Sequence, residues 1–468
     1  MATLRLFTNQ LIHGEPSSHL KWVIIGVVLV IAPVIAFFAN FSQKMLILEL
    51  ILLVLMVIAF LRWPPVSLVV LVVISLISPF SLGTGTDTSL SANILLLSLL
   101  LGLWLVDLFV SKNRSKTVLS RSYLPLIILL GAITFSFLNG QLPWYMLVRG
   151  APLRAQIGAL AMIVFAVGAF VLVAWHTEEI KWLRRMTWAF LIIGALIVIG
   201  RIIPQVGQLF NQYYSEPVSH SIFWVWMVAI SLSQALFNQQ LKTHWRVALF
   251  ALVISAFYVT LIKGRFWSSG WIPALIAVVG IIWFGMPRLR WLVLAGGVLI
   301  ILLSNQWIVN FVMYGNDYSW ITRLEAWRIV LDMTKASPIL GLGPANYRFY
   351  TPLFPIMGYY VQFNSHNNFI DIFAQFGLIG LGLFLWFFIE VGLSGLKLRN
   401  KVSDGFAHAY LIGGLGGLLG MLTAGMLGDW FLPFVYNIGL SGFQISLLGW
   451  MFLGGIVAIE QIYKKVSN

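Results

Sequence analysis

One histidine and a set of arginines are the residues of this sequence best suited to chemistry. His366 precedes Asn367 and Asn368, follows a long polar segment and opens an apolar one. A neutral imidazole at such a boundary can accept a proton from a substrate hydroxyl. Arginine side chains bind phosphate groups through paired hydrogen bonds. Whether arginines reach His366 depends on the elements that carry them.

Composition sets the class of protein. The chain has 468 residues, of which 60% are hydrophobic and 9% are charged, whereas soluble domains average about 25% charged residues. A polytopic membrane protein without a large soluble domain is therefore predicted. The absence of cysteine excludes disulfides, thiol nucleophiles and cysteine metal sites. The net charge of +14 is attributed to membrane topology rather than to nucleic-acid binding.

The apolar segments predict an all-α integral membrane protein of about 12–14 transmembrane helices, with one long external loop containing an amphipathic helix. A single membrane domain is expected, with N-terminal helices in 1–309, the loop in 310–366 and C-terminal helices in 367–468. The first span is interpreted as a retained helix, because no small-residue cleavage pattern follows it. The fourteen predicted spans are 22–40, 45–61, 66–83, 92–110, 123–139, 156–174, 187–203, 221–237, 247–262, 268–285, 291–309, 367–390, 406–428 and 437–459.

Basic residues assign the two sides of the membrane. The side carrying Lys112, Arg114, Lys116 and Arg121 is taken as the cytoplasm, which predicts that both termini are cytoplasmic. The basic residues that fall on the external side are Lys44, Arg149, Arg154, Arg201, Lys263, Arg265, Arg323, Arg328, Lys335 and Arg348. Each of these arginines either contacts lipid headgroups and solvent or binds a ligand.

Among the external arginines, the position of Arg265 in the membrane most strongly indicates ligand binding. It lies in the hairpin Lys263-Gly264-Arg265-Phe266-Trp267, which is too short to leave the membrane surface. Charged residues held at such depths commonly face a protein interior or a water-filled cavity. Arg265 is therefore expected to point into a cavity between helices.

The long external loop is expected to begin with an amphipathic helix over 319–336. Arg328 and Asp332 have the spacing of an i,i+4 ion pair. Arg323 and Arg328 lie about 140° apart on a helical wheel, so one could face a ligand while the other is paired. The predicted apolar face consists of Trp320, Leu324, Trp327 and Leu331.

A turn and an aromatic-rich stretch follow this helix. Gly341-Leu342-Gly343-Pro344 predicts a tight turn. The aromatic residues either form a belt on the bilayer surface or provide a platform for the apolar faces of sugar rings. They are Tyr347, Phe349, Tyr350, Phe354, Tyr359, Tyr360 and Phe363.

His366 is expected in the first turn of the next span, with Ser365 or Asn364 as the N-cap. A helix N-terminus disfavours added positive charge, which would keep the imidazole neutral and able to act as a base. The alternative is that the histidine only caps the helix. Asp371 lies about 140° around this helix and is a poor partner for the ring. The external acids are scattered, so neither a metal nor a cofactor is expected; they are Asp87, Glu216, Asp317, Glu325, Asp332 and Asp429.

Glycines predict close helix packing in the last third of the chain. Gly413 with Gly417, and Gly416 with Gly420, are pairs of small residues spaced by one helical turn. Such pairs let membrane helices approach closely.

Three ordered blocks carry a family resemblance. They are Arg323-Leu-Glu-Ala-Trp327, Ser337-Pro-Ile-Leu-Gly-Leu-Gly343-Pro344-Ala-Asn346-Tyr347, and His366-Asn-Asn-Phe with Gly377-Leu-Ile-Gly380. Over about residues 260–390 this order resembles the O-antigen ligase and polymerase superfamily. The family often has a glutamate before the glycine, where this chain has Gln375 two positions before Gly377.

The resemblance implies transfer of a glycan from a polyprenyl diphosphate carrier by an external histidine and external arginines. It implies catalytic roles for His366 and Arg265, and diphosphate binding by Arg265, Arg323, Arg328 and Arg348. The family's arginine-x-x-x-leucine pattern is not matched at Arg265, where Ser269 takes the last position, or at Arg323, where Trp327 does.

The predicted function is therefore that of a glycosyltransferase on the outer face of the plasma membrane. The expected partners are a polyprenyl diphosphate-linked oligosaccharide, a glycan, lipid or protein acceptor, and membrane lipids, but not nucleic acid. The reaction is expected to be metal-independent and inverting. The alternative is a transporter or flippase for a lipid-linked glycan or another anion. The sequence favours transfer, because it lacks the two similar halves common in transporters.

Overall fold

The computed structural model describes residues 60, 62–83, 89–110, 120–210, 215–302, 317–402, 405–437 and 439–467. In this part, the chain is an all-α membrane protein, as predicted, and its strands β1 (Ser81–Gly83) and β2 (Ser89–Ser91) form one small antiparallel hairpin. The predicted span 22–40, nearly all of 45–61, and Lys44 lie outside the described residues.

Eight described helices are long and apolar enough to cross a membrane. They include α5 (Ala92–Val110), α7 (Leu153–His176), α8 (Ile180–Ile202), α13 (Ser268–Gly285), α18 (Asn368–Leu398), α19 (Phe406–Leu427), α20 (Gly439–Ser467), and α12 (Thr243–Phe257) with its π-helical continuation η1 (Tyr258–Lys263). Shorter apolar helices are α4 (Pro64–Ile77), α6 (Tyr123–Asn139) and α11 (Ser221–Phe237). The remaining helices before the long loop are α9 (Pro204–Phe210), α10 (Ser215–Val218), η2 (Pro287–Leu289) and α14 (Arg290–Leu302).

Most predicted spans have a helical counterpart. Those at 92–110, 123–139, 221–237 and 268–285 coincide with α5, α6, α11 and α13. The span predicted at 66–83 is wrong at its end, because α4 stops at Ile77 and β1 begins at Ser81. Pro79 explains the early stop, since it disfavours helical geometry in the preceding residue. The helix predicted to begin at 187 starts earlier, at Ile180.

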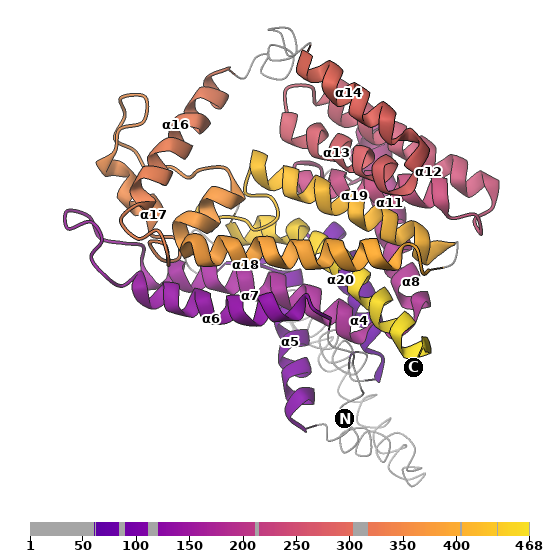
Figure 1. The fold of residues 1–468 in the computed structure, drawn as a ribbon, viewed down its shortest axis with the longest axis horizontal. Coiled ribbons are helices and arrows are strands. Elements are labelled where there is room, and N and C mark those ends of the chain that lie inside the picture. The colour runs from indigo at the N-terminus through magenta and orange to yellow at the C-terminus, as the bar shows by residue number, and fades with distance from the viewer. Residues whose placement is uncertain are drawn as a thin grey trace, which may run out of the picture.

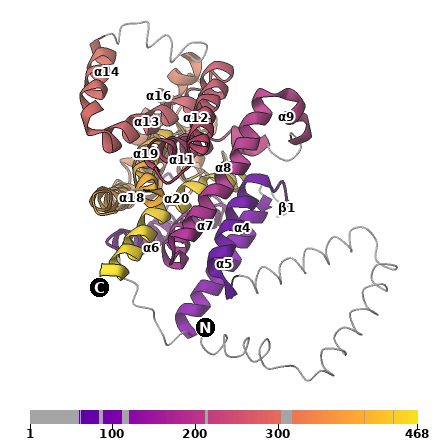
Figure 2. The same ribbon diagram turned by 90° about the vertical axis from the view of Figure 1, so that its right-hand side faces the viewer.

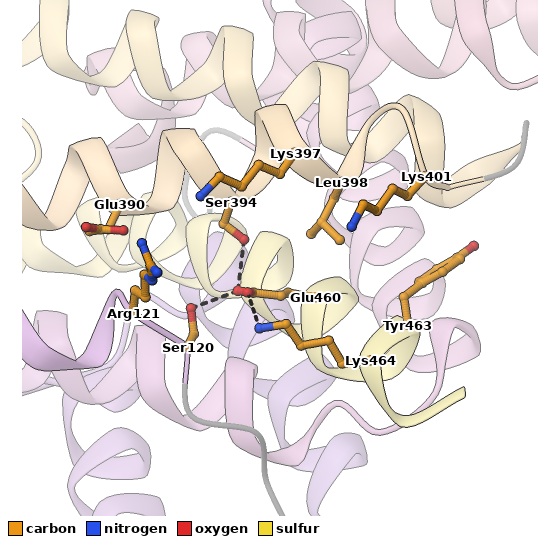
Figure 3. Close-up of a pocket in the computed structure, with 10 residues that line it drawn as sticks. All are labelled: Ser120, Arg121, Glu390, Ser394, Lys397, Leu398, Lys401, Glu460, Tyr463 and Lys464. Atoms are coloured by element: carbon orange, nitrogen blue, oxygen red, sulfur yellow. Dashed lines mark hydrogen bonds and ion pairs between the residues drawn. The ribbon is translucent and has the colours of Figure 1, made fainter. Parts of the chain in front are cut away.

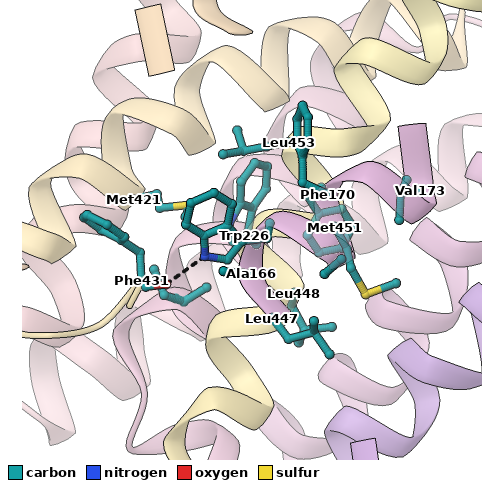
Figure 4. Packing of buried hydrophobic residues seen from close by; sticks show 14 of the residues in the cluster. Ala166, Phe170, Val173, Trp226, Met421, Phe431, Leu447, Leu448, Met451 and Leu453 are labelled. Atoms are coloured by element: carbon teal, nitrogen blue, oxygen red, sulfur yellow. Dashed lines mark hydrogen bonds between the residues drawn. The ribbon is translucent and has the colours of Figure 1, made fainter. Parts of the chain in front are cut away.

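The helices α7, α11, α19 and α20 form the core of the bundle (Figures 1 and 2). The whole apolar window of α20 is buried against other helices. Figure 4 shows Phe170 of α7, Trp226 of α11 and Met421 of α19 around α20. The indole N–H of Trp450 donates to the carbonyl of Phe431, 2.8 Å away, and this bond ties the core to the loop before α20.

Close packing in the core depends on the predicted glycine pairs of α19. A side chain at Gly413 or Gly417 would collide with Ser233 or Trp226 of α11. The other pair, Gly416 and Gly420, faces the backbone of α13. Each pair therefore lets α19 approach a different neighbour, as small residues do in membrane bundles.

The long segment before α18 folds over one end of the bundle. It contains α16 (Asp317–Thr334), α17 (Tyr347–Tyr350) and η3 (Thr351–Leu353), which lie at the left of Figure 1, where α18 begins. We call this the His366 end of α18, and the end at Leu398 the opposite end. The predicted helix over 319–336 is confirmed, with slightly different ends.

The predicted apolar face of α16 is only partly right. Trp320 and Trp327 are half-buried, but Leu324 and Leu331 are 54% and 41% exposed. The fully buried face consists of Ala326, Ile329, Val330 and Met333, and the last three pack on the turn and on α17. Both sets recur at helical spacing, so tertiary contacts decide which set is covered.

The predicted turn at 341–344 is inserted into a break in α18. Gly377 has φ 66°, and the backbone N–H groups of Leu342 and Gly343 donate to the carbonyls of Ala374 and Gln375 at 2.8 and 3.1 Å. A side chain at Gly377 would collide with the carbonyl of Ile339. The break leaves carbonyls without helical partners, and the turn satisfies them.

Gln375 explains why an amide suits the position where the family often has a glutamate. Its side-chain oxygen accepts from the N–H of Ala345 at 2.9 Å, and its nitrogen donates to the carbonyl of Asp371 at 3.1 Å. An ionised glutamate could accept but not donate. Gln375 therefore links the turn to the first part of α18.

Candidate functional site

His366 lies just before α18, at the edge of the folded long segment. The helix starts one residue later than expected: its N-cap is Asn367, whose side chain accepts from Phe369 N–H at 3.0 Å and Ile370 N–H at 3.4 Å. The prediction of Ser365 or Asn364 as N-cap is therefore wrong. His366 is not in the first turn but precedes the cap.

The backbone at His366 is strained. Its φ is 51°, in the left-handed region that non-glycine residues rarely occupy. Ser365 supports this conformation, because its hydroxyl accepts from Asn367 N–H at 3.0 Å and its carbonyl accepts from the Trp327 indole at 2.7 Å. Such strain often occurs at functional sites, where the surrounding structure maintains it.

Asp429 is the acidic neighbour of His366. Its carboxylate oxygen Oδ1 lies 4.0 Å from His366 Nδ1, and the carboxylate is buried, whereas the His366 side chain is 41% exposed. Asn437 lies between them, with its amide nitrogen 2.7 Å from Asp429 Oδ1 and 3.3 Å from His366 Nδ1. In the sequence, Asp429 is one of several scattered external acids, and the fold brings it to His366.

The loop between α19 and α20 fixes Asp429 in place. Asp429 Oδ2 accepts from the N–H of Phe434 at 2.9 Å. From α18, Asn368 accepts from Phe431 N–H at 3.0 Å and donates to the Leu432 carbonyl at 2.6 Å. Asn368, two positions after His366, therefore holds the loop that carries Asp429.

A second buried acid, Asp371, supports the backbone rather than the imidazole. Its Oδ1 accepts from the hydroxyls of Tyr347 and Ser365. The Tyr347 hydroxyl in turn accepts from Ser365 N–H at 3.2 Å. The expectation that Asp371 is a poor partner for the ring agrees with these contacts, and its bonds instead hold the residue before His366.

The electrostatic surroundings favour a neutral His366. Partial burial lowers its pKa, Asp429 raises it, and Arg323 and Arg348 lower it further. The net pKa lies below the ordinary value of 6.5. Burial raises the pKa of Asp429, although its hydrogen bonds and His366 oppose this effect. At neutral pH the imidazole can therefore accept a proton.

Arg323 is the arginine of α16 that faces this site. Its guanidinium donates to the Leu427 carbonyl at 3.1 Å, next to the Asp429 loop, and lies over the Trp320 ring. Burial lowers the pKa of Arg323, and Asp429 opposes that shift. Its charge therefore lies at the edge of the same site as His366.

Arg328 is directed elsewhere. Its side chain is 75% exposed and lies 3.9 Å from Glu325. The predicted pair with Asp332 is wrong, because Asp332 instead pairs with Lys335 at 2.7 Å. The difference between Arg323 and Arg328 follows from their angular separation on one helix.

Arg348 approaches the site from α17. Its guanidinium lies 5.4 Å from the centre of the Tyr436 ring. Burial lowers its pKa, and its Nε has no hydrogen-bond partner among the residues that the structure describes. Together with its effect on the His366 pKa, these features place Arg348 beside the same loop as Asp429.

Arg265 lies in a hairpin that packs against the Asp429 loop. The Trp267 ring contacts the Trp430 ring, and the Ser269 hydroxyl donates to the Leu427 carbonyl at 3.2 Å. The Arg265 side chain is exposed. A neighbouring cavity of about 350 Å³ is lined by Lys263, Gly264 and Trp267 but not by Arg265, whose expected position in a cavity stays a prediction.

The aromatic residues of the long segment divide into three groups. Tyr347 and Tyr350 are buried and belong to the core under α16. Tyr359 and Tyr360 are 66% and 71% exposed, and Phe349, Phe354 and Phe363 are half-buried. The buried pair therefore cannot meet a sugar or a bilayer surface. Among the described residues, no group of three or more His, Asp or Glu side chains forms a candidate metal site.

Replacing Asp429 with asparagine is expected to move the acidic limb of the pH–activity profile to lower pH. The carboxylate raises the pKa of His366, so removing its charge lowers that pKa further. A less basic imidazole is also expected to reduce the plateau rate by about tenfold, part of the about 10²–10⁴-fold effect of a general base. The measurement is kcat/KM as a function of pH.

Asp332→Asn is the matched control, because it removes an exposed carboxylate that pairs with Lys335. Both carboxylate oxygens of Asp429 accept hydrogen bonds, so in Asp429→Asn the new amide NH2 group faces another donor. This clash lowers the stability of the folded protein by about 1–3 kcal/mol, so Tm is measured for both variants. If Asp429 had only a structural role, Asp429→Asn would lower Tm without moving the acidic limb of the pH–activity profile. That outcome would contradict the electrostatic role.

Comparison with known families supports the resemblance in the sequence. Residues 243–385 match a family model described as O-antigen ligase. This range contains His366, Arg265, Arg323, Arg328 and Arg348, but not Asp429. No curated protein matches the chain.

Proposed function

The chain belongs to the O-antigen ligase and polymerase superfamily, and from this premise we propose that it transfers a glycan from a polyprenyl diphosphate carrier to an acceptor hydroxyl. The observation that carries the proposal is the arrangement around His366. This histidine has a lowered pKa that favours its neutral form, and it lies beside buried Asp429, with Arg323 and Arg348 at the same site. We place this reaction on the outer face of the plasma membrane.

In the proposed reaction, His366 is the general base. The acceptor oxygen attacks the anomeric carbon, and its proton moves to Nε2 of His366. This requires the tautomer with hydrogen on Nδ1. The negative charge of Asp429 favours that tautomer, whereas the Asn437 amide nitrogen, a donor 3.3 Å from Nδ1, opposes it, so this contact is expected to be given up when substrate binds. The 4.0 Å separation of Nδ1 and Asp429 is expected to shorten when substrate binds, as catalytic hydrogen bonds often do.

Arg323 and Arg348 are proposed to bind the departing diphosphate. The bond between the anomeric carbon and the diphosphate oxygen breaks, and the oxygen keeps the electron pair. Positive groups that are already positioned stabilise this developing charge more than they stabilise the bound donor. Direct attack opposite the leaving group inverts the anomeric centre.

Arg265 and Arg328 have weaker support as diphosphate ligands. Arg265 is exposed, and its hairpin contacts the Asp429 loop through Trp267. Arg328 is directed away from His366. We propose Arg265 as an outer contact for the donor and assign no donor contact to Arg328.

Surface glycans of a strain lacking this gene test the biological role. Loss of all attached glycan would indicate a ligase, and single attached repeats would indicate a polymerase. Complementation with the wild-type protein is expected to restore the normal pattern. Unchanged length and amount of attached glycan in the deletion strain would contradict both versions of the proposal.

A further inference from the structure

A cavity of about 430 Å³ lies at the opposite end of α18 from His366 (Figure 3). It is formed by the last turns of α18 and α20 together with Ser120 and Arg121, which precede α6. Its volume falls within the range of about 300–1,000 Å³ typical of ligand pockets. The 31 residues of α18 rise about 1.5 Å each, so roughly a bilayer thickness separates this cavity from His366.

One carboxylate in the cavity is already satisfied. Glu460 accepts from Ser120 at 2.7 Å and from Ser394 at 2.8 Å, and its other oxygen pairs with Lys464 at 2.7 Å. Figure 3 shows these three bonds converging on Glu460. The Glu460 carboxylate is therefore paired with Lys464, and the hydroxyls of Ser120 and Ser394 fix the position of the carboxylate.

Three other cations line the same cavity without an ion pair in the described part of the chain. They are Arg121, Lys397 and Lys401. The remaining acid, Glu390, accepts from the Trp386 indole at 3.1 Å. Lysines near a helix C-terminus also offset the helix dipole, but Arg121 stands on a different segment. The convergence of cations from separate segments favours a bound anion.

We propose that this cavity binds the phosphate group of an anionic phospholipid. Arginine offers a planar fork for phosphate oxygens, and the two lysines add mobile point charges. Leu398 and Tyr463 provide adjoining apolar surface for the lipid. The cavity lies at the ends of two apolar spans, where basic pockets between helices bind anionic headgroups. All of its cations lie on the side that the sequence predicts to be cytoplasmic.

Lipid titration of the delipidated full-length protein tests this site. Native mass spectrometry is expected to show dioleoyl phosphatidylglycerol binding in preference to dioleoyl phosphatidylcholine. The double variant Lys397→Gln/Lys401→Gln is expected to weaken phosphatidylglycerol binding by about 30-fold, and Lys401→Gln alone by about fivefold. If the double variant does not fold, Lys401→Gln alone tests the site.

The matched control is Lys242→Gln/Arg288→Gln, which removes two exposed cations from the same predicted side but from no part of this cavity. It is expected to change the affinity by less than about threefold. Equal affinity of the wild type for both lipids, or equal losses in the cavity and control variants, would overturn the proposal. Inorganic phosphate binding as tightly as phosphatidylglycerol would overturn the lipid assignment.

Discussion

Replacing His366 with alanine is expected to lower kcat for glycan transfer by about 10²–10⁴-fold. The imidazole is the proposed proton acceptor, and alanine leaves the acceptor hydroxyl without one. Donor affinity is expected to change by less than about threefold, because the proposed diphosphate contacts come from arginines. Single-turnover kinetics with bound donor measure the chemical step, and donor titration measures the affinity.

The expected pH dependence of the wild type follows from the same residue. Since the pKa of His366 lies below 6.5, the rate is expected to fall only as the pH drops through that lowered value. His244→Ala is a matched control, because this histidine is exposed at the start of α12, far along the chain from the site. A His366→Ala protein that retains the wild-type Tm and the wild-type rate would contradict the base assignment.

Replacing Arg323 with glutamine is expected to lower kcat/KM by about 10²–10³-fold, the typical effect of removing one group that stabilises charge in the transition state. The guanidinium lies beside the Asp429 loop and influences the pKa of His366. Removing its positive charge also raises the pKa of His366, so the acidic limb is expected to move to higher pH. Steady-state kinetics over a pH series measure both effects.

Arg328→Gln is the control for this prediction, because it removes the same charge from the same helix. Arg328 is exposed and lies near Glu325, so its replacement is expected to change kcat/KM by less than about threefold. Arg323 also bonds to the Leu427 carbonyl, and a Tm measurement separates a loosened loop from a lost charge. Similar kinetic losses in both variants would contradict the assignment of Arg323 to the site.

Local sequence patterns predicted much of the helical framework. Apolar length and turn residues placed α5, α6, α11 and α13 at their observed bounds. The paired glycines of α19 predicted close packing, since small residues at one-turn spacing let membrane helices approach closely. The angular separation of Arg323 and Arg328 also predicted that they face different ways.

The acidic neighbour of His366 could not be found from local patterns. Asp429 lies 63 positions further along the chain, and the conformation of its loop depends on Asn368, Phe434 and Asn437. One usable signal was present: Asp429 is an acid in the short segment between the last two spans, on the same predicted side as His366. The apolar face of α16 was partly mistaken for a related reason, because only tertiary contacts select Val330 and Met333 over Leu324 and Leu331.

Acceptor-dependent release of the free carrier diphosphate is the most direct test of the proposed transfer reaction. Purified protein in lipid nanodiscs would be given a labelled lipid-linked oligosaccharide, with and without an acceptor glycan or lipid. One free polyprenyl diphosphate is expected for each glycosylated product, and neither product is expected without acceptor or with His366→Ala. Movement of intact donor across reconstituted vesicles, with no glycosylated product and no free diphosphate, would contradict the proposed transfer.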